Sequence, residues 1–202
     1  MSPSLSLREE RKIRTSATIA AAALDLFAAR GYAAVTVAEV AAAAQVGERT
    51  LYRYFADKED LLFAEDDGWR ASLRAAIEQE PAGEPPFTVL RGAAATLARA
   101  LEDRREEVRR HGEVIASAPA LAARERAKHA AWEADLAEGL CARGVAAGEA
   151  RLLGRITVAC FDEALTRWLA QDGPHRTLGS ELDATFAELG ALATRPQPTT
   201  RT

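Results

Sequence analysis

Cysteine and histidine are scarce in this sequence: its 202 residues include two cysteines, Cys141 and Cys160, and three histidines. Two cysteines at irregular positions do not make a disulfide framework or a zinc site, so we expect two buried thiols in a reducing compartment. Long apolar runs are also missing, because no stretch reaches the roughly 18 residues that a membrane span requires. The N-terminal segment is charged and lacks an apolar signal core. We therefore expect a soluble, cytoplasmic protein without a metal or a cofactor.

Catalytic motifs are absent as well. None of the three histidines is paired at metal-ligand spacing, and the sequence contains no Gly-rich phosphate loop and no nucleophile elbow. The acidic pairs Glu102-Asp103 and Glu106-Glu107 lie in a charge run that is typical of a solvated helix surface. The sequence therefore disfavours an enzyme.

Aromatic residues make up only 6% of a chain that is 48% hydrophobic, so alanine supplies much of the apolar content. Alanine is the best helix former and a poor strand former. There is no strand-like alternation of useful length. The composition and its patterning predict an all-α fold of about nine helices.

The charge is unevenly distributed along the chain. The whole chain has a formal net charge of −4, whereas residues 1–58 contain eight Lys/Arg and six Asp/Glu, a net charge of +2. A mildly basic N-terminal segment, residues 1–58, attached to an acidic remainder is typical of a protein that binds nucleic acid through its N-terminal part only.

Capping patterns define three helices in this N-terminal segment. Ser6 and Glu9 form a capping box for a helix that we expect to end at Arg30, before Gly31. Thr36 and Glu39 form a second capping box, for a short helix over residues 37–43. A turn at residues 45–47 separates it from a third helix over residues 48–54. Two short helices joined by a turn of this length are typical of a helix-turn-helix.

The rest of the chain reads as six further helical stretches. Asp57, with Asp60 three residues later, predicts the N-cap of a long helix that ends near Gln79. Glycine and proline residues then divide the sequence into helices near 87–110, 111–117, 120–143, 148–171 and 178–193. Residues 1–6 and 195–202 are predicted to be flexible tails.

The segment from Thr36 to Leu62 resembles the DNA-binding motif of the TetR family of transcription regulators. Its most specific part is Thr-Leu-Tyr-Arg-Tyr-Phe-Ala-Asp-Lys at residues 50–58, and the resemblance covers about residues 13–62. The resemblance implies a helix-turn-helix domain over residues 7–56 and a ligand-binding and dimerisation domain over residues 57–194. It also implies a homodimer that binds double-stranded operator DNA and a small-molecule effector.

The third helix carries the side chains expected to meet DNA. The guanidinium group of Arg49 or Arg53 can donate two hydrogen bonds to one guanine, and Glu48 can accept a hydrogen bond from cytosine. Thr50 suits a thymine methyl group or a phosphate. The resemblance further implies phosphate contacts from Thr36, Tyr52, Tyr54 and Lys58, although the two tyrosines also suit simple packing. Leu51 and Phe55, four residues apart, are expected to pack this helix against its own domain.

Two residues depart from the family pattern. Gln45 stands where the turn usually has glycine, so we expect it to adopt a positive φ at a cost of about 1 kcal/mol. Gly47, which belongs to the expected DNA-binding set, stands where the third helix usually has a serine cap. Glycine caps a helix almost as well as serine but lacks a hydroxyl that would reach a phosphate.

The sequence of the C-terminal domain, residues 57–194, says less about function. The segment from Pro119 to Gly144 resembles regulators of acyl-CoA-like ligands, among them the mycofactocin-system regulators. Candidate ligand-pocket residues are Trp69, Leu73, Phe87, Leu97, Ile115, His129, Trp132, Leu136 and Phe161. Ordinary core packing is the alternative for each of them, because pockets and cores use the same residue types. Candidate dimer-interface residues on the last two helices are Ile156, Cys160, Leu165, Trp168, Leu182, Phe186 and Leu189.

These features predict a ligand-responsive repressor that binds a palindromic operator as a dimer and is released by an apolar or amphipathic effector, such as an acyl-CoA-like molecule. A transcriptional activator and a ligand-independent DNA-binding protein are the alternatives.

Overall fold

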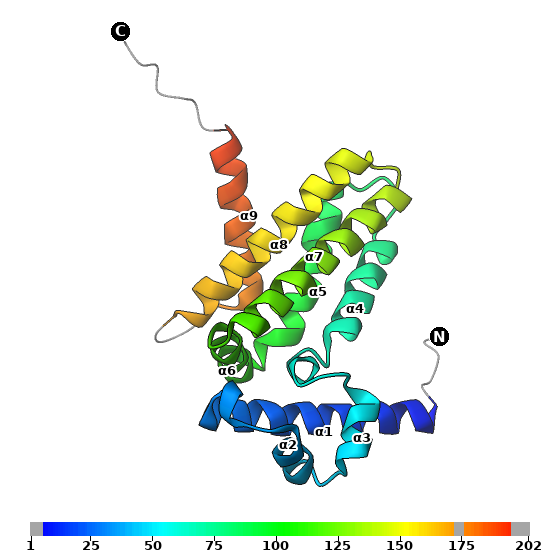
Figure 1. The fold of residues 1–202 in the computed structure, drawn as a ribbon. Coiled ribbons are helices and arrows are strands. Elements are labelled where there is room, and N and C mark those ends of the chain that lie inside the picture. The colour runs from blue at the N-terminus through cyan, green and yellow to red at the C-terminus, as the bar shows by residue number, and fades with distance from the viewer. Residues whose placement is uncertain (1–5, 172–175, 195–202) are drawn as a thin grey trace. The chain divides into compact units, whose positions relative to one another are not determined.

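The computed structural model describes residues 6–171 and 176–194, and these residues form nine α-helices and two short 3₁₀ helices, without a strand (Figure 1). In chain order the elements are α1 (Leu7–Arg30), η1 (Tyr32–Ala34), α2 (Val37–Ala43), α3 (Glu48–Tyr54), η2 (Glu59–Leu62), α4 (Asp66–Gln79), α5 (Pro86–Glu102), α6 (Arg105–Ala116), α7 (Pro119–Ala142), α8 (Ala147–Leu169) and α9 (Leu178–Thr194). The all-α prediction is confirmed. The prediction of two buried thiols is wrong for Cys141, which is exposed, whereas Cys160 is buried. Apart from Ser6, the predicted tails lie outside the described residues.

The first three helices begin and end where their capping residues predict. The Ser6 hydroxyl accepts a hydrogen bond from Glu9 N at 3.3 Å, and the Glu9 carboxylate accepts one from Ser6 N at 2.9 Å. Thr36 and Glu39 form the same reciprocal pair at the start of α2. Gly31 ends α1 with a φ of 84°, a value that residues with a Cβ rarely adopt.

Two predicted helix boundaries are wrong. Asp57 does cap the backbone, because Asp60 N donates to Asp57 Oδ1 at 2.8 Å, but the turn that follows is only the 3₁₀ helix η2. Leu61 and Leu62 are drawn into the core there, and α4 begins at Asp66. The predicted helices near 87–110 and 111–117 are divided at the wrong place. The break falls at Asp103–Arg104, and Gly112 lies inside α6.

The chain divides into two compact units. One comprises the residues up to Trp69 together with Glu106–Lys128, and the other comprises Arg70–Arg105 and the residues from His129 onward. These ranges differ from the predicted domains, because Leu61, Leu62, Val114, Ile115 and Leu121 join the apolar cluster that α1, α2 and α3 bury. That the ranges 7–56 and 57–194 are the functional domains stays a prediction.

The first unit is held together by polar contacts as well as by its core. On α6, Arg110 Nη1 donates to Asp25 Oδ1 of α1 at 2.7 Å. The His111 ring nitrogen Nε2 lies 2.8 Å from the carbonyl oxygen of Leu62. On α7, Arg124 forms ion pairs with Asp60 and, at 3.6 Å, with Asp57. Parts of α6 and α7 therefore hold the segment that directly follows α3.

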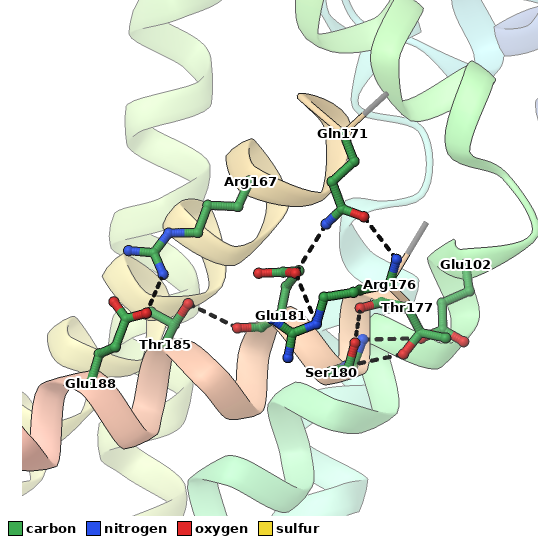
Figure 2. Close-up of polar contacts among 10 residues, drawn as sticks. Glu102, Arg167, Gln171, Arg176, Thr177, Ser180, Glu181, Thr185 and Glu188 are labelled. Atoms are coloured by element: carbon green, nitrogen blue, oxygen red, sulfur yellow. Dashed lines mark hydrogen bonds and ion pairs between the residues drawn. The ribbon is translucent and has the colours of Figure 1, made fainter. Parts of the chain in front are cut away.

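In the second unit, α8 and α9 are tied to each other and to α5 by polar contacts (Figure 2). The buried Glu181 of α9 accepts a hydrogen bond from Gln171 Nε2 at 3.0 Å, and Glu102 of α5 accepts one from Gly179 N at 3.0 Å. Further along the two helices, Arg167 Nη1 donates to Glu188 Oε1 at 2.8 Å. Arg105 caps the C-terminal end of α8, because its Nη2 donates to the carbonyl oxygens of residues 168, 169 and 171 at 3.0–3.1 Å.

No helix among the described residues combines the length and the hydropathy that a crossing of a lipid bilayer needs.

Candidate nucleic-acid interface

The helix pair α2 and α3 rests on a continuous apolar core. Leu51 and Val40 are fully buried, and Phe55, which follows α3, is 4% exposed. Ile19, Ala23 and Phe27 of α1 lie in the same cluster. The prediction that Leu51 and Phe55 pack α3 against its own domain is confirmed. With one face of α3 fixed in the core by Leu51, the opposite face of the helix is exposed to solvent.

That opposite face carries the side chains expected to read DNA. Glu48, Arg49, Tyr52 and Arg53 are all exposed, and Thr50 is half-buried. Tyr52 is 53% exposed, so both its ring and its phenol are accessible to a partner. Two guanidinium groups, a phenol and a carboxylate on seven residues form a surface able to donate and accept hydrogen bonds in a groove.

The turn before α3 has the strained geometry that the sequence predicts. Gln45 has a φ of 55°, and among the described residues it is the one residue other than glycine with a positive φ. The turn is closed by hydrogen bonds from Ala44 N to Val40 O and from Val46 N to Ala41 O, each 2.9 Å long. This is the left-handed ending that usually has glycine. Gly47 is the N-cap of α3 and supplies no side-chain cap.

Tyr54 lies at the end of α3, where its ring faces α1. The Arg53 guanidinium lies 5.3 Å from the centre of the Tyr54 ring. Hydrogen bonds from Arg53 and then from Thr15 lower the pKa of the Tyr54 phenol below its ordinary value. The phenol is therefore oriented by its own domain and keeps one edge toward solvent, as a phosphate contact requires.

Two of the predicted phosphate contacts use their polar groups inside the protein. The Thr36 hydroxyl donates to Glu39 Oε2 at 2.9 Å and accepts from Glu39 N, so the capping box occupies it. The Lys58 ammonium donates to the carbonyl oxygen of Tyr32 at 2.5 Å. Contacts from these two residues to phosphate stay predictions.

The candidate ligand residues are divided between the two compact units. Trp69 and Ile115 belong to the first unit, where Ile115 is part of the core around α1. The other seven lie in the second unit: Leu73, Leu97, Trp132, Leu136 and Phe161 are buried, and Phe87 and His129 are half-buried. A pocket of about 280 Å³ in this unit is lined by Ala82, Gly83, Glu84, Pro86, Leu140, Arg143, Gly144 and Val145. None of the nine candidates lines it.

Four of the candidate interface residues point into the core of their own chain. Cys160, Trp168, Leu182 and Phe186 are between 1% and 6% exposed. Ile156, Leu165 and Leu189 are half-buried. The large apolar residues that these two helices leave most exposed are Leu152 at 59% and Leu192 at 61%, which the sequence analysis did not select.

Sequence reasoning also missed a charged cluster between α4 and α7. Asp135 is 5% exposed and accepts hydrogen bonds from Arg70 and Arg74. Arg143, the residue that follows α7, donates to the carbonyl oxygens of residue 77 in α4 and of residue 80 just after it. The spacing of Asp135 and Arg143, two helical turns apart, would have indicated that both charged side chains lie on one side of this helix.

This arrangement defines a helix-turn-helix protein, with a pair of short helices fixed on an apolar core and an exposed, charged second helix. Residues 19–64 match the bacterial regulatory proteins of the TetR family, and residues 84–193 match the MftR C-terminal domain. The chain belongs to the TetR family of transcriptional regulators and has a C-terminal domain of the MftR type. The family resemblance predicted from residues 13–62 is confirmed.

Two related sequences illustrate the relationship. The chain is 38% identical over 87 residues to the HTH-type transcriptional regulator TcmR of Streptomyces glaucescens, a match that spans 43% of this chain and 38% of TcmR. It is 30% identical over 135 residues to the Mycobacterium tuberculosis protein named as mycofactocin biosynthesis transcriptional regulator MftR, across 66% of this chain and 67% of that one. Both relatives are named as transcriptional regulators.

Solved structures share the fold over nearly the whole chain. FadR of Thermus thermophilus, a TetR-family transcriptional repressor in complex with lauroyl-CoA, is 25% identical, with a TM-score of 0.55 over 93% of this chain and 99% of its own. FadR of Bacillus subtilis, in complex with stearoyl-CoA, is 20% identical, with a TM-score of 0.59 over 88% of this chain and 97% of its own. Because FadR of Bacillus subtilis is only 20% identical, its similarity supports the fold and nothing further.

Proposed function

We propose that the protein is a repressor that binds a palindromic operator as a homodimer and leaves it when a small apolar or amphipathic effector binds. The observation that carries the proposal is the outer face of α3, where Arg49, Tyr52 and Arg53 are exposed around a helix whose other face is buried. A helix of this kind enters the major groove with its N-terminal residues toward the base edges.

The exposed residues have distinct roles in the proposed complex. Arg49 or Arg53 forms a bidentate pair with guanine, and Glu48 accepts from cytosine; each good pair contributes about 1–3 kcal/mol of discrimination. Thr50, Tyr52 and Tyr54 contact phosphates or a thymine methyl group and fix the register of the protein on the duplex. Gly47 lets the start of α3 approach DNA without a side chain in the way.

The dimer is proposed to form through α8 and α9. One recognition helix reads one half-site, and two half-sites about one helical turn apart require two copies of the chain. Leu152 and Leu192 are the large exposed apolar side chains on these helices, and the half-buried Ile156, Leu165 and Leu189 accompany them. Cys160, Trp168, Leu182 and Phe186 support this surface from within the same chain.

The effector is proposed to be an acyl-CoA-like molecule held in the second unit. FadR of Thermus thermophilus binds lauroyl-CoA, and the C-terminal match is to the MftR type. Leu73, Leu97, Trp132, Leu136 and Phe161 provide the apolar side chains that an acyl chain needs. Because coupling between two binding sites is reciprocal, operator DNA weakens effector binding by the factor by which effector weakens operator binding.

Fluorescence anisotropy with a labelled fragment from upstream of the protein's own gene tests the proposal. Added lauroyl-CoA or stearoyl-CoA is expected to lower the affinity for that fragment, and lauric acid without the CoA group serves as the control. Operator affinity that no acyl-CoA changes would contradict the effector assignment and favour a ligand-independent DNA-binding protein. Tighter binding in the presence of the acyl-CoA would favour an activator or co-repressed regulator.

A further inference from the structure

The net positive charge of the N-terminal segment, residues 1–58, lies in the first turns of α1. Residues 8–14 contain four Lys/Arg and two Asp/Glu, a net charge of +2, whereas residues 15–58 contain four of each and are neutral. The TetR-family match begins at residue 19, so this charged stretch precedes the matched segment. Because α1 is one continuous helix from Leu7 to Arg30, the stretch is fixed to the compact unit that contains α3.

The cations of this stretch are exposed and share a face of the helix. Those exposed to solvent are Arg8, Arg11, Lys12 and Arg14. Arg8, Arg11 and Lys12 stand at i, i+3 and i+4, a spacing that makes them neighbours on the helix surface. The Glu9 carboxylate is engaged at the helix start, where it accepts hydrogen bonds from Ser6 N at 2.9 Å and Ser6 Oγ at 2.6 Å. The basic face is defined here as Arg8, Arg11 and Lys12.

The basic face adjoins the end of the recognition helix. Thr15 follows Arg8 at i+7, on the same side of α1. Hydrogen bonds from Arg53 and then from Thr15 lower the pKa of Tyr54, and the charge of Lys12 acts in the same direction. In Figure 1, the N-terminal turns of α1 continue beyond α3. The basic face therefore extends, along α1, the surface that begins at the Tyr54 phenol.

We propose that Arg8, Arg11 and Lys12 bind the phosphates that flank each operator half-site, so that DNA contact extends along α1 beyond the helix-turn-helix. This inference rests on the proposed DNA-binding function. The contact adds affinity that does not depend on base sequence, because phosphates are the same at every base pair. From Arg8 to Thr15 the helix rises about 10 Å, which is the length of about three base pairs of duplex. The basic face is therefore long enough to meet successive phosphates of one strand.

Salt dependence measures how many phosphates the basic face neutralises, because each adds about 0.9 to the slope of log K against log salt concentration. On a random duplex of about 40 base pairs, the double variant Arg8→Gln/Arg11→Gln is expected to lower this slope by about 1.8. Glutamine is a good helix former, and the variant leaves Lys12 beside Tyr54 in place. The matched control Arg99→Gln/Arg126→Gln removes two exposed arginines from α5 and α7 and is expected to leave the slope unchanged. An unchanged slope in Arg8→Gln/Arg11→Gln overturns the proposal and indicates an ordinary solvated helix surface.

Neutral phosphates test the same contacts without altering the protein. In an operator duplex whose phosphates just outside each half-site are replaced by methylphosphonates, the slope of the wild type is expected to fall at least as far as it does in Arg8→Gln/Arg11→Gln. The variant is expected to lose less on this duplex. A wild type that binds duplex with a slope that the methylphosphonates leave unchanged contradicts the inference alone. A wild type that binds no duplex, even at low salt, contradicts the proposed function and the inference together.

Discussion

Asp135 of α7 accepts a hydrogen bond from Nε of Arg70 of α4 at 2.6 Å, although its side chain is almost fully removed from water. Arg74, one turn further along α4, donates to the other carboxylate oxygen at 2.9 Å. Gly139 and Arg143 continue the contact on the same face of α7, Gly139 against Ile77 and Arg143 at the end of α4. Within the second unit, α4 and α7 are therefore joined over three successive turns.

Replacing Asp135 by asparagine is expected to lower the free energy of unfolding by about 1–3 kcal/mol, because two guanidinium groups lose the carboxylate that compensates them. Glu138→Gln, an exposed residue of the same helix, is the control and is expected to change stability by less than about 0.5 kcal/mol. Urea unfolding followed by circular dichroism measures both. Equal stability of the two variants would show that the cluster contributes nothing.

The same cluster predicts a loss of stability in acid. Burial raises the pKa of Asp135, but the hydrogen bonds from Arg70 and Arg74 outweigh burial and hold the pKa below its ordinary value of 3.8. A carboxyl group with a lowered pKa in the folded state stabilises that state above its ordinary pKa, and this stabilisation is lost as the pH falls through the folded-state value. Unfolding free energies measured from about pH 5 to about pH 2 should therefore fall more steeply for the wild type than for Asp135→Asn. If the unfolding free energies of the wild type and Asp135→Asn fell equally steeply between these pH values, Asp135 would not be the source of the acid sensitivity.

The contact between α7 and α8 is expected to tolerate no methyl group at Gly154. A Cβ at this position would lie 2.8 Å from the carbonyl oxygen of Glu133, so α8 would have to move away from α7. Gly154→Ala is expected to destabilise the protein by about 1–3 kcal/mol. Gly112→Ala, inside α6 and with open space around it, is expected to stabilise by about 0.5–1 kcal/mol. Thermal unfolding of both variants measures this: the midpoint temperature is expected to fall for Gly154→Ala and to rise for Gly112→Ala.

The turn of the helix-turn-helix stores strain at Gln45. Because its φ of 55° costs a residue with a Cβ about 1 kcal/mol or more, Gln45→Gly is expected to stabilise the protein by about that amount. Gln45→Ala keeps the Cβ and is expected to give no such gain. A glycine variant less stable than the wild type would mean that the lost side chain contributes more than the strain removes.

The capping boxes and the helix-turn-helix were predictable because their information is local. Ser6 with Glu9, and Thr36 with Glu39, satisfy backbone groups three residues away, so residue types alone locate the helix starts. Gln45 at the turn position likewise required a positive φ. The exposed residues of α3 were predictable because Leu51 and Phe55 mark the buried face.

What was not predictable depends on contacts between distant segments. Asp57 and Asp60 have the pattern of a helix start, but burial of Leu61 and Leu62 in a core shared with α6 ends the turn after one 3₁₀ step. Lys58 matches a motif position, yet its partner Tyr32 lies 26 residues away. The sequence of α9 likewise could not reveal that Leu182 and Phe186 would be buried in their own chain.

Nuclease footprinting on the fragment upstream of the protein's own gene tests the central claim most directly. Wild-type protein is expected to protect two inverted half-sites with centres about 10 base pairs apart, or a multiple of that spacing. Arg49→Ala is expected to bind this fragment about 1–3 kcal/mol more weakly and to bind shuffled duplex nearly as well as the wild type does. Equal affinity of the wild type for the upstream fragment and for shuffled duplex, at low salt and without acyl-CoA, would contradict the account.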